Sequence, residues 1–302
     1  MPVTAVKVIL PKTKIVYPRA VITFTPDSIA TTCTNCSFNV VSTRMAKYLA
    51  KYYGIKLAVT TTLGDNSKIF VEDLFTTLIN GYWSQRYAKT LYTLDTPFVG
   101  TTLWINPNRI PTYIHTTSLW NYAVARYFGI NADVVPRGVD DDVADAVFNS
   151  VTRRIEKAGV NAVKKFDVVA LLTGVPGVKY KNHKLVHDVL NTLGIRERSV
   201  LICDEPYCDI KTWTLSTEQV YEYMASAYLF VTLSETEGFG IPPAEAMAVG
   251  TPVVHFDSVF VSAPFVSCAV TDGNEHNGNP STGYNRTSRC NIMFDRIVDA
   301  VN

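Results

Sequence analysis

The fold is decided by the stretch Leu233-Ser-Glu-Thr-Glu-Gly-Phe-Gly-Ile-Pro-Pro-Ala-Glu-Ala-Met-Ala-Val-Gly-Thr-Pro-Val-Val254. Residues 228–233, which lead into it, are apolar and β-branched enough for a buried parallel strand. Pro242 and Pro243 suit the first turn of a helix, because the N–H group that proline lacks would have no partner there. Gly250 ends that helix at a position that favours positive φ, and a further strand follows. A strand, a glycine-bearing turn and a helix N-terminus together favour anion binding.

Two carboxylates flank the glycine turn, Glu237 before it and Glu245 in the helix after it. A carboxylate repels a phosphate, so both acids need another partner, and sugar hydroxyls are the natural one. Glu245 is placed to accept hydrogen bonds from a diol, while Glu237 is expected at the rim of the site. The alternative is that both acids only favour a helix N-terminus, as acidic side chains commonly do.

The whole string resembles the Glu-x7-Glu signature of family 4 retaining glycosyltransferases, which have the GT-B fold. The matching positions are Ser234, Glu237, Gly238, Phe239, Gly240, Pro242, Glu245, Ala246, Met247, Ala248, Gly250, Pro252, Val253 and Val254. The resemblance is specific over this motif and weak over most of the remaining chain. It implies an α/β fold of two facing Rossmann-like domains, each with a parallel sheet, and a cleft between them.

The resemblance also implies a reaction, the metal-independent transfer of a sugar from a nucleoside diphosphate sugar to an acceptor hydroxyl with retention. Glu245 would then bind the ribose hydroxyls, and Glu237 would bind the donor sugar. Backbone N–H groups of the turn would stabilise the leaving diphosphate. The donor-binding turn consists of Gly238, Phe239, Gly240 and Ile241.

Family members also bring an Arg and a Lys to the diphosphate from the loop after the first strand of the second domain. Here Lys181 occupies the Lys position and Gly174 the glycine of the pattern, but Pro176 stands where the Arg is expected. Lys179 is a candidate substitute, although its ammonium group lacks the bidentate fork of arginine. The alternative for both lysines is an exposed position on a loop.

Two further candidates come from the ends of predicted strands. His115 is expected to face the cleft and contact a sugar hydroxyl, with a structural role as the alternative. Tyr207 follows the strand at 199–203, where the family binds the base. The family's glycine-rich turn after the first strand is missing, and residues 25–37 are expected to form a surface loop. The catalytic candidates are therefore Glu237, Lys181 and His115.

The 302 residues suit two domains of roughly 140 residues each. Residues 132–140 resemble the strand and turn that leave the first domain in this family, so we expect an acceptor-binding domain at 1–138 and a nucleotide-sugar-binding domain at 139–302. A terminal helix near 290–302 often packs back across the first domain in such proteins. The expected strands are 1–10, 20–24, 56–61, 90–94, 111–115, 166–172, 199–203, 228–233 and 251–254. The expected helices are 38–53, 69–78, 118–128, 183–193, 216–224, 242–249 and 293–301.

Composition excludes several classes of partner. A net charge of +1 and the absence of long basic runs argue against nucleic-acid binding. No apolar window is long enough for a membrane span, and the N-terminus lacks a signal-peptide pattern. We therefore expect a soluble, cytoplasmic protein whose partners are a nucleotide sugar and an acceptor of unknown class (glycan, lipid or protein). A weak peripheral membrane contact and the oligomeric state remain open.

No cofactor or metal is expected. Asp140, Asp141 and Asp142 resemble a metal-binding Asp-x-Asp motif, but they precede a predicted helix, where acids favour the N-terminus. The six cysteines lack the spacing of a zinc site, and we expect free or structural thiols, with disulfides and redox chemistry as alternatives. Disulfides in an intracellular protein would suggest a hyperthermophilic source.

Three other functions fit parts of this pattern. A nucleotide-sugar epimerase shares the fold and the donor site, but it needs additional acids and a histidine in the cleft. A catalytically degenerate protein would bind a nucleotide sugar without turning it over, and the missing Arg and glycine turn favour that alternative. A dinucleotide oxidoreductase is disfavoured, because no Gly-x-Gly-x-x-Gly follows an early strand.

Overall fold

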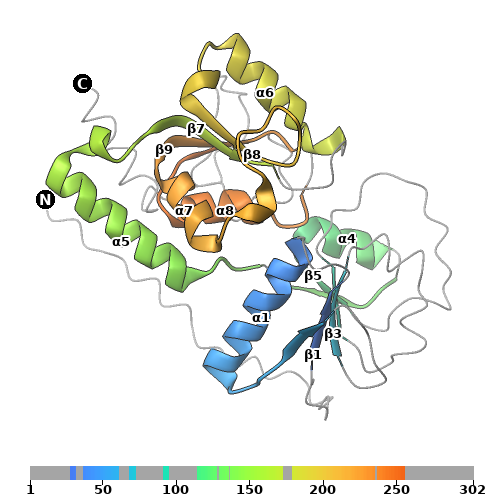
Figure 1. Ribbon diagram of the computed structural model, residues 1–302. Coiled ribbons are helices and arrows are strands. Elements are labelled where there is room, and N and C mark those ends of the chain that lie inside the picture. Colours follow the sequence, from blue (N-terminus) through green and yellow to red (C-terminus); the bar gives the residue numbers. More distant parts are fainter. Residues whose placement is uncertain are drawn as a thin grey trace, which may run out of the picture.

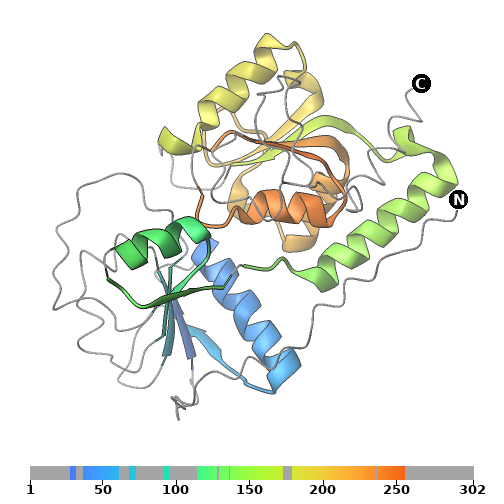
Figure 2. The same cartoon turned by 180° about the vertical axis from the view of Figure 1, so that it is seen from behind.

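The computed structural model describes residues 28–31, 37–60, 68–72, 91–94, 114–127, 129–135, 137–172, 179–234 and 237–255. Within these ranges the chain forms two α/β units, each built on a parallel sheet (Figures 1 and 2). The predicted fold class, an α/β protein with two parallel-sheet units, is therefore confirmed. The domain limits at 138 and 139 stay a prediction. The strands expected at 1–10 and 20–24 and the terminal helix expected near 290–302 lie outside the described residues.

The first unit has six parallel strands in the order β2-β1-β3-β4-β5-β6. Helix α1 (Ser37–Tyr53) packs on β1, β2 and β3, while α4 (Leu119–Tyr127) packs on β5 and β6. The strands are β1 (Ser28–Thr31), β2 (Ala58–Thr60), β3 (Lys68–Glu72), β4 (Leu91–Leu94), β5 (Ile114–Thr116) and β6 (Ala132–Val134).

Two predictions for the first unit are wrong. Residues 69–72 form strand β3, not the start of a helix, and they pair with both β1 and β4. Ile69, Phe70 and Val71 are a short apolar run, whose periodicity does not distinguish helix from strand. Ser28–Thr31 is the strand β1 between β2 and β3, not part of a surface loop. The fully buried Ile29 packs this short strand, Ser-Ile-Ala-Thr, against α1, so tertiary packing outweighs composition here.

The second unit has four parallel strands in the order β10-β9-β7-β8. Helices α5, α7 and α8 contribute to the apolar core on one face of this sheet, and α6 contributes to the core on the other. The strands are β7 (Phe166–Leu171), β8 (Ser199–Ile202), β9 (Ala227–Thr232) and β10 (Val253–His255). The helices are α5 (Asp141–Ala158), α6 (His183–Thr192), α7 (Thr217–Ala225) and α8 (Ile241–Ala248), with 3-10 turns η2 (Val160–Ala162), η3 (Lys179–Lys181), η4 (Arg196–Arg198) and η5 (Thr212–Thr214).

Local sequence signals fix several helix ends as predicted. Ser118 accepts a hydrogen bond from the Asn121 N–H at 3.2 Å, at the start of α4. Ser216 caps α7 in a reciprocal capping box with Gln219. Gly250 follows α8 with φ 82°, a backbone conformation that side chains with a Cβ rarely adopt.

Two buried groups of the second unit have consequences for stability. Lys164 is 5% exposed, and its Nζ donates to the carbonyl oxygens of Ala225 at 2.9 Å and Ala227 at 2.6 Å. Cys203 and Cys208 form a disulfide, with Cα atoms 5.6 Å apart, so the expectation of free thiols is wrong for this pair. None of the helices in the described ranges has the length and apolarity that crossing a bilayer requires.

Candidate active site at the junction of the two units

The glycine turn delivers the chain from β9 into α8 with its backbone facing the other unit. Gly240 is the N-cap of α8 and has φ 77°, a left-handed conformation that glycine adopts without steric cost. Pro242 lies in the first turn of α8, as predicted. Gly238, Phe239 and Gly240 are all buried. Pro242 and Pro243 carry no N–H group, so Ile241 is the residue of the first turn whose backbone N–H could face an anion.

Glu245 is the central buried acid of the site. Its side chain is 5% exposed and forms an ion pair with Arg44, which lies on α1 of the other unit. The hydroxyl of Tyr221 donates a hydrogen bond to Glu245 Oε1 at 3.3 Å. Burial raises the pKa of Glu245, and the Arg44 guanidinium opposes that rise. Glu245 raises the pKa of Arg44 in turn, against the effect of burial. The pair is thus a charge contact between two units that neither unit could satisfy alone.

A cavity of about 120 Å³ opens beside this ion pair. Glu245 and Pro242 of α8 form one wall, Arg44 forms another, and Trp213 of η5 provides an aromatic surface. The remaining lining residues are Ser37, Val40, Leu171, Thr212, Leu215, Thr217, Val220, Tyr221 and Ile241. A carboxylate, a guanidinium, an aromatic side chain and the first turn of a helix therefore surround one hollow.

Glu237 and Lys181 meet on the other side of Pro242. Lys181 Nζ donates to both carboxylate oxygens of Glu237, at 2.5 and 2.6 Å, and the side chains are 13% and 18% exposed. Asn182, the next residue, has φ 51° and donates to the Leu233 carbonyl at 3.0 Å, which fixes η3 against the end of β9. Two predicted site residues that are 56 positions apart are therefore in direct contact.

The first unit also contacts the glycine turn directly. The hydroxyl of Thr117, which is 3% exposed, donates to the Gly238 carbonyl at 2.9 Å. Ile241, the first residue of α8, packs against the apolar cluster that contains Ile29 and Val41. The turn is consequently held by both units.

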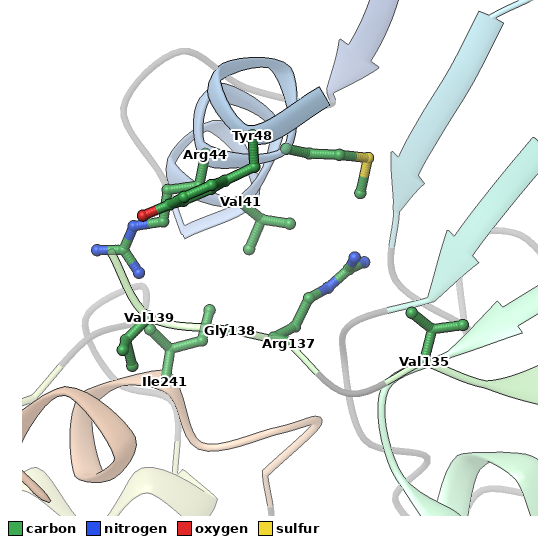
Figure 3. A pocket seen from close by; sticks show the side chains of 9 residues that line it. Val41, Arg44, Tyr48, Val135, Arg137, Gly138, Val139 and Ile241 are labelled. Carbon is green, nitrogen blue, oxygen red and sulfur yellow. The ribbon is translucent and has the colours of Figure 1, made fainter. Parts of the chain in front are cut away.

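A second cavity, of about 220 Å³, lies between α1 and residues 135 and 137–140, the described part of the linker that joins the units. Arg44 and Ile241 line this cavity as well as the first one. Figure 3 shows Arg44 and Tyr48 projecting from α1 toward the linker, while Arg137 projects from the linker. The other lining residues are Val41, Met45, Val135, Gly138 and Val139. Arg44 therefore stands at the boundary of two cavities.

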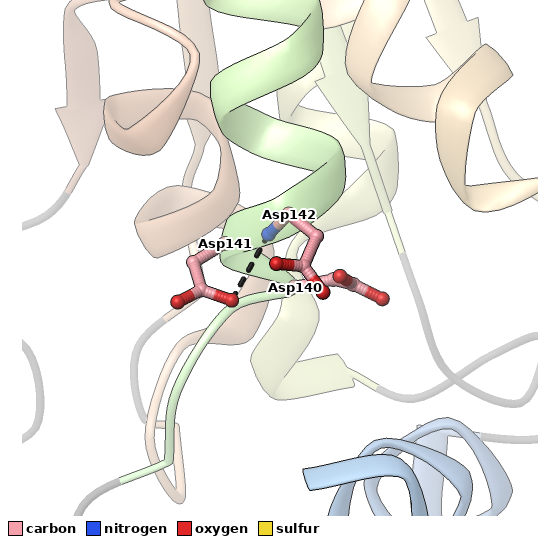
Figure 4. A group of neighbouring side chains, drawn as sticks. All are labelled: Asp140, Asp141 and Asp142. Carbon is pink, nitrogen blue, oxygen red and sulfur yellow. Dashed lines mark hydrogen bonds between the residues drawn. The ribbon is translucent and has the colours of Figure 1, made fainter. Parts of the chain in front are cut away.

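The acidic cluster Asp140, Asp141 and Asp142 lies where the linker enters α5 (Figure 4). Oxygens of the three carboxylates lie within 4.8 Å of one another, a spacing that could hold a metal ion. Each carboxylate is already in contact with α1. Lys47 binds Asp140 at 2.6 Å and Lys51 binds Asp142 at 2.6 Å. The Tyr48 hydroxyl donates to Asp141.

The remaining predicted residues occupy different positions. His115 lies in β5 and is half-buried, and burial lowers its pKa, with Arg137 acting in the same direction. Tyr207 packs against the ring of His187 at 4.8 Å, and it is not among the residues that line the two cavities. Lys179 begins η3, and Gly174 lies outside the described residues. The roles of these four residues stay predictions.

The structure adds residues that the sequence patterns did not indicate. Arg44, Tyr221, Thr117 and Trp213 all contact the site or line its cavities. Of these residues, Arg44 has the clearest signal in the sequence, since it belongs to a row of basic and aromatic residues at helical spacing along α1. That row consists of Arg44, Lys47, Tyr48 and Lys51.

Known proteins with similar sequences decide the family. "Glycosyl transferases group 1" is the family that matches residues 210–270, a segment that includes η5, α7, β9, α8 and β10. "Putative glycosyltransferase ORF378" of Acidianus filamentous virus 2 is 33% identical in an alignment 299 positions long, which covers 86% of this chain and 79% of that protein. The chain belongs to the glycosyltransferase family.

Two further proteins are similar to this glycosyltransferase at lower sequence identity. "Putative glycosyltransferase 63" of Sulfolobus islandicus filamentous virus is 28% identical over 235 residues, which cover 75% of each chain. Among solved structures, Anabaena Alr3699/HepE in complex with UDP and glucose aligns with 84% of this chain and 79% of its own, at 16% identity and a TM-score of 0.44. That score is too low to support conclusions about the site.

Proposed function

We propose that this glycosyltransferase transfers a sugar from a nucleoside diphosphate sugar to an acceptor hydroxyl, with retention of configuration and without a metal ion. The observation that supports this most directly is the pair of acids around the buried glycine turn. Glu245 faces the cavity beside Trp213, and Glu237 is held by Lys181 on the other side of Pro242. Ribose, diphosphate and sugar would then follow one another along the start of α8.

Each group has a defined task in this reaction. The carboxylate of Glu245 accepts hydrogen bonds from the ribose hydroxyls, and that of Glu237 accepts them from the donor sugar. The bond between the anomeric carbon and the diphosphate oxygen breaks, and its electron pair leaves with the nucleoside diphosphate. Lys181 and the N–H groups of the turn stabilise that charge. The acceptor oxygen attacks the same face and gives its proton to the departing phosphate.

Two observations support the finer parts of the proposal. The carboxylates of Asp140 and Asp142 are neutralised by Lys47 and Lys51, which favours charge stabilisation by basic side chains over a metal ion at that cluster. The lowered pKa of His115 favours a neutral imidazole, which can hydrogen-bond a sugar hydroxyl without carrying charge.

The test is a panel of nucleotide sugars, with thermal stabilisation and nucleotide release followed together, in the presence and absence of EDTA. A donor at a hundred times its Kd should stabilise the protein by about 2.7 kcal/mol. Release that EDTA does not affect, with a product that keeps the donor's anomeric configuration by NMR, is expected. An inverted product would refute retention, and loss of release in EDTA would refute metal independence. Free sugar epimer would indicate an epimerase, and stabilisation without release would indicate a binding protein.

The residue-level control compares two glutamates. Glu245→Ala should abolish thermal stabilisation by the nucleotide sugar, because the ribose hydroxyls lose the carboxylate that accepts their hydrogen bonds. Glu222→Ala is the matched variant, since Glu222 lies on α7 with a side chain 43% exposed and pairs with Arg154 away from the site. Equal donor binding by both variants would sink the assignment of Glu245.

A further inference from the structure

We infer that Arg44 is a donor-binding residue, whose guanidinium leaves Glu245 and binds the diphosphate when the ribose reaches that carboxylate. This inference rests on the proposed function. It adds to that function a donor-binding residue from the first unit, which lies outside the Glu-x7-Glu motif of the second unit. It begins with the ion pair itself. Arg44 and Glu245 are 201 positions apart, and their side chains are only 12% and 5% exposed. The carboxylate proposed for the ribose is therefore paired with the Arg44 cation in this structure.

The guanidinium of Arg44 has hydrogen-bonding capacity to spare. Its Nη2 contacts Glu245, whereas its buried Nη1 has no hydrogen-bond partner among the described atoms. A buried donor without a partner destabilises the folded state, and the effect is larger when the donor is charged. An anionic ligand that reached Nη1 would remove this cost. The group is therefore poised to accept a second anion beside the first.

The place of Arg44 in the site makes a phosphate the fitting anion. Arg44 lines the same cavity as Pro242 and Ile241, which form the first turn of α8. Ile241 carries the N–H group of this turn, since Pro242 and Pro243 have none, and the planar guanidinium of Arg44 matches two phosphate oxygens at once. The neighbouring cavity, of about 220 Å³, also has Arg44 in its wall, so the side chain has space on either side of its present position.

The composition of the second unit supplies the reason that such a residue is needed. Pro176 stands where the family pattern has an arginine, and the nearby Lys181 is engaged by Glu237. A nucleoside diphosphate carries more negative charge than one ammonium group neutralises. Binding the ribose at Glu245 releases one guanidinium at the moment the diphosphate arrives. A single exchange of partners would thus couple recognition of the ribose to recognition of the phosphates.

The experiment measures how much the diphosphate adds to binding. Calorimetry on the full chain compares a nucleoside with its diphosphate, for uridine, guanosine, adenosine, cytidine and thymidine, and continues with the base that the wild type binds. The quantity measured is the Kd of the nucleoside divided by the Kd of its diphosphate, which states how much the diphosphate strengthens binding. A purely structural role of Arg44 would change both Kd values together and leave this ratio unchanged.

We expect Arg44→Gln to lower the ratio about 10- to 100-fold, the range for one or two charge-assisted hydrogen bonds. Arg44→Lys should recover part of it, since charge remains but the fork is lost. Lys47→Gln is the matched control, because Lys47 lies on the same helix, binds Asp140 and is 39% exposed. It should leave the ratio unchanged.

Two outcomes overturn the inference, and they differ. If the wild type binds a diphosphate and Arg44→Gln keeps the wild-type ratio, the assignment of Arg44 is wrong while the proposed function stands. If the wild type binds none of the five diphosphates, the proposed function fails, and the role of Arg44 fails with it.

Discussion

Removing Arg44 should produce a loss of stability that depends on pH in a way set by Glu245. In Arg44→Met the carboxylate of Glu245 stays buried and keeps only the hydroxyl of Tyr221 as a described side-chain partner. The folded variant can relieve this by binding a proton at Glu245. The free energy of protonating that carboxylate is therefore the upper limit of the stability lost through the unpaired charge. With an unfolded pKa of 4.5, that limit is about 3.4 kcal/mol at pH 7 and about 0.7 kcal/mol at pH 5.

The sign follows from proton binding. The folded variant has a raised Glu245 pKa, so between 4.5 and that value it binds more protons than the unfolded chain, and its stability falls as pH rises. For 302 residues, the upper limit of about 3.4 kcal/mol corresponds to a decrease in Tm of at most about 5 °C. Differential scanning calorimetry at pH 7 and pH 5 measures it, with the wild type alongside.

The double variant Arg44→Met, Glu245→Gln supplies the control, because it has no carboxylate to protonate. Its stability relative to the wild type should lack the steep loss between pH 5 and pH 7, and it should be more stable at pH 7 than the single variant. A single variant whose Tm lies within 1 °C of the wild type at pH 7, or whose deficit is the same at pH 5, would refute the reasoning.

Three further changes test other contacts. Burial lowers the pKa of Lys164 from 10.5 to about 8. Between these pH values the unfolded chain binds more protons than the folded chain, so the free energy of unfolding should rise by up to about 3 kcal/mol from pH 8 to 10.5. Urea denaturation should show this rise in the wild type and not in Lys164→Met. Thr117→Val removes the donor to the Gly238 carbonyl and should cost about 1–2 kcal/mol in thermal unfolding, whereas Thr117→Ser should retain most of it. Opening the Cys203–Cys208 loop by Cys208→Ser should cost about 2 kcal/mol, and a denaturation midpoint that the substitution leaves unchanged would contradict this.

The parts of the fold that could be predicted are those governed by short-range rules. The turn from β9 into α8 follows from glycines and prolines whose backbone limits are intrinsic, so its helix start and its left-handed Gly240 were predictable. The cap of α7 at Ser216 is equally local. Strand β1 was not predictable in this way, because its place in the middle of the sheet depends on β2 and β3.

The site residues likewise fall into those that local sequence rules predict and those that depend on contacts between the two units. Glu237, Lys181 and Glu245 were identified because they belong to a motif whose spacing is fixed within the second unit. Arg44 was not identified, because no local rule links a residue on α1 to a carboxylate on α8. The row of like charges along α1 was a usable signal, since such a helix face needs an acidic counterpart somewhere in the protein.

The position of Ile241 has a consequence for how such enzymes can be recombined. This residue begins the helix of the motif, yet its apolar partners belong to the first unit. A chimera that joined this second unit to the first unit of a relative would place Ile241 against a surface shaped for another side chain. Exchange of halves between members of this family is therefore expected to succeed only when the residues facing Ile241 are transferred together with it.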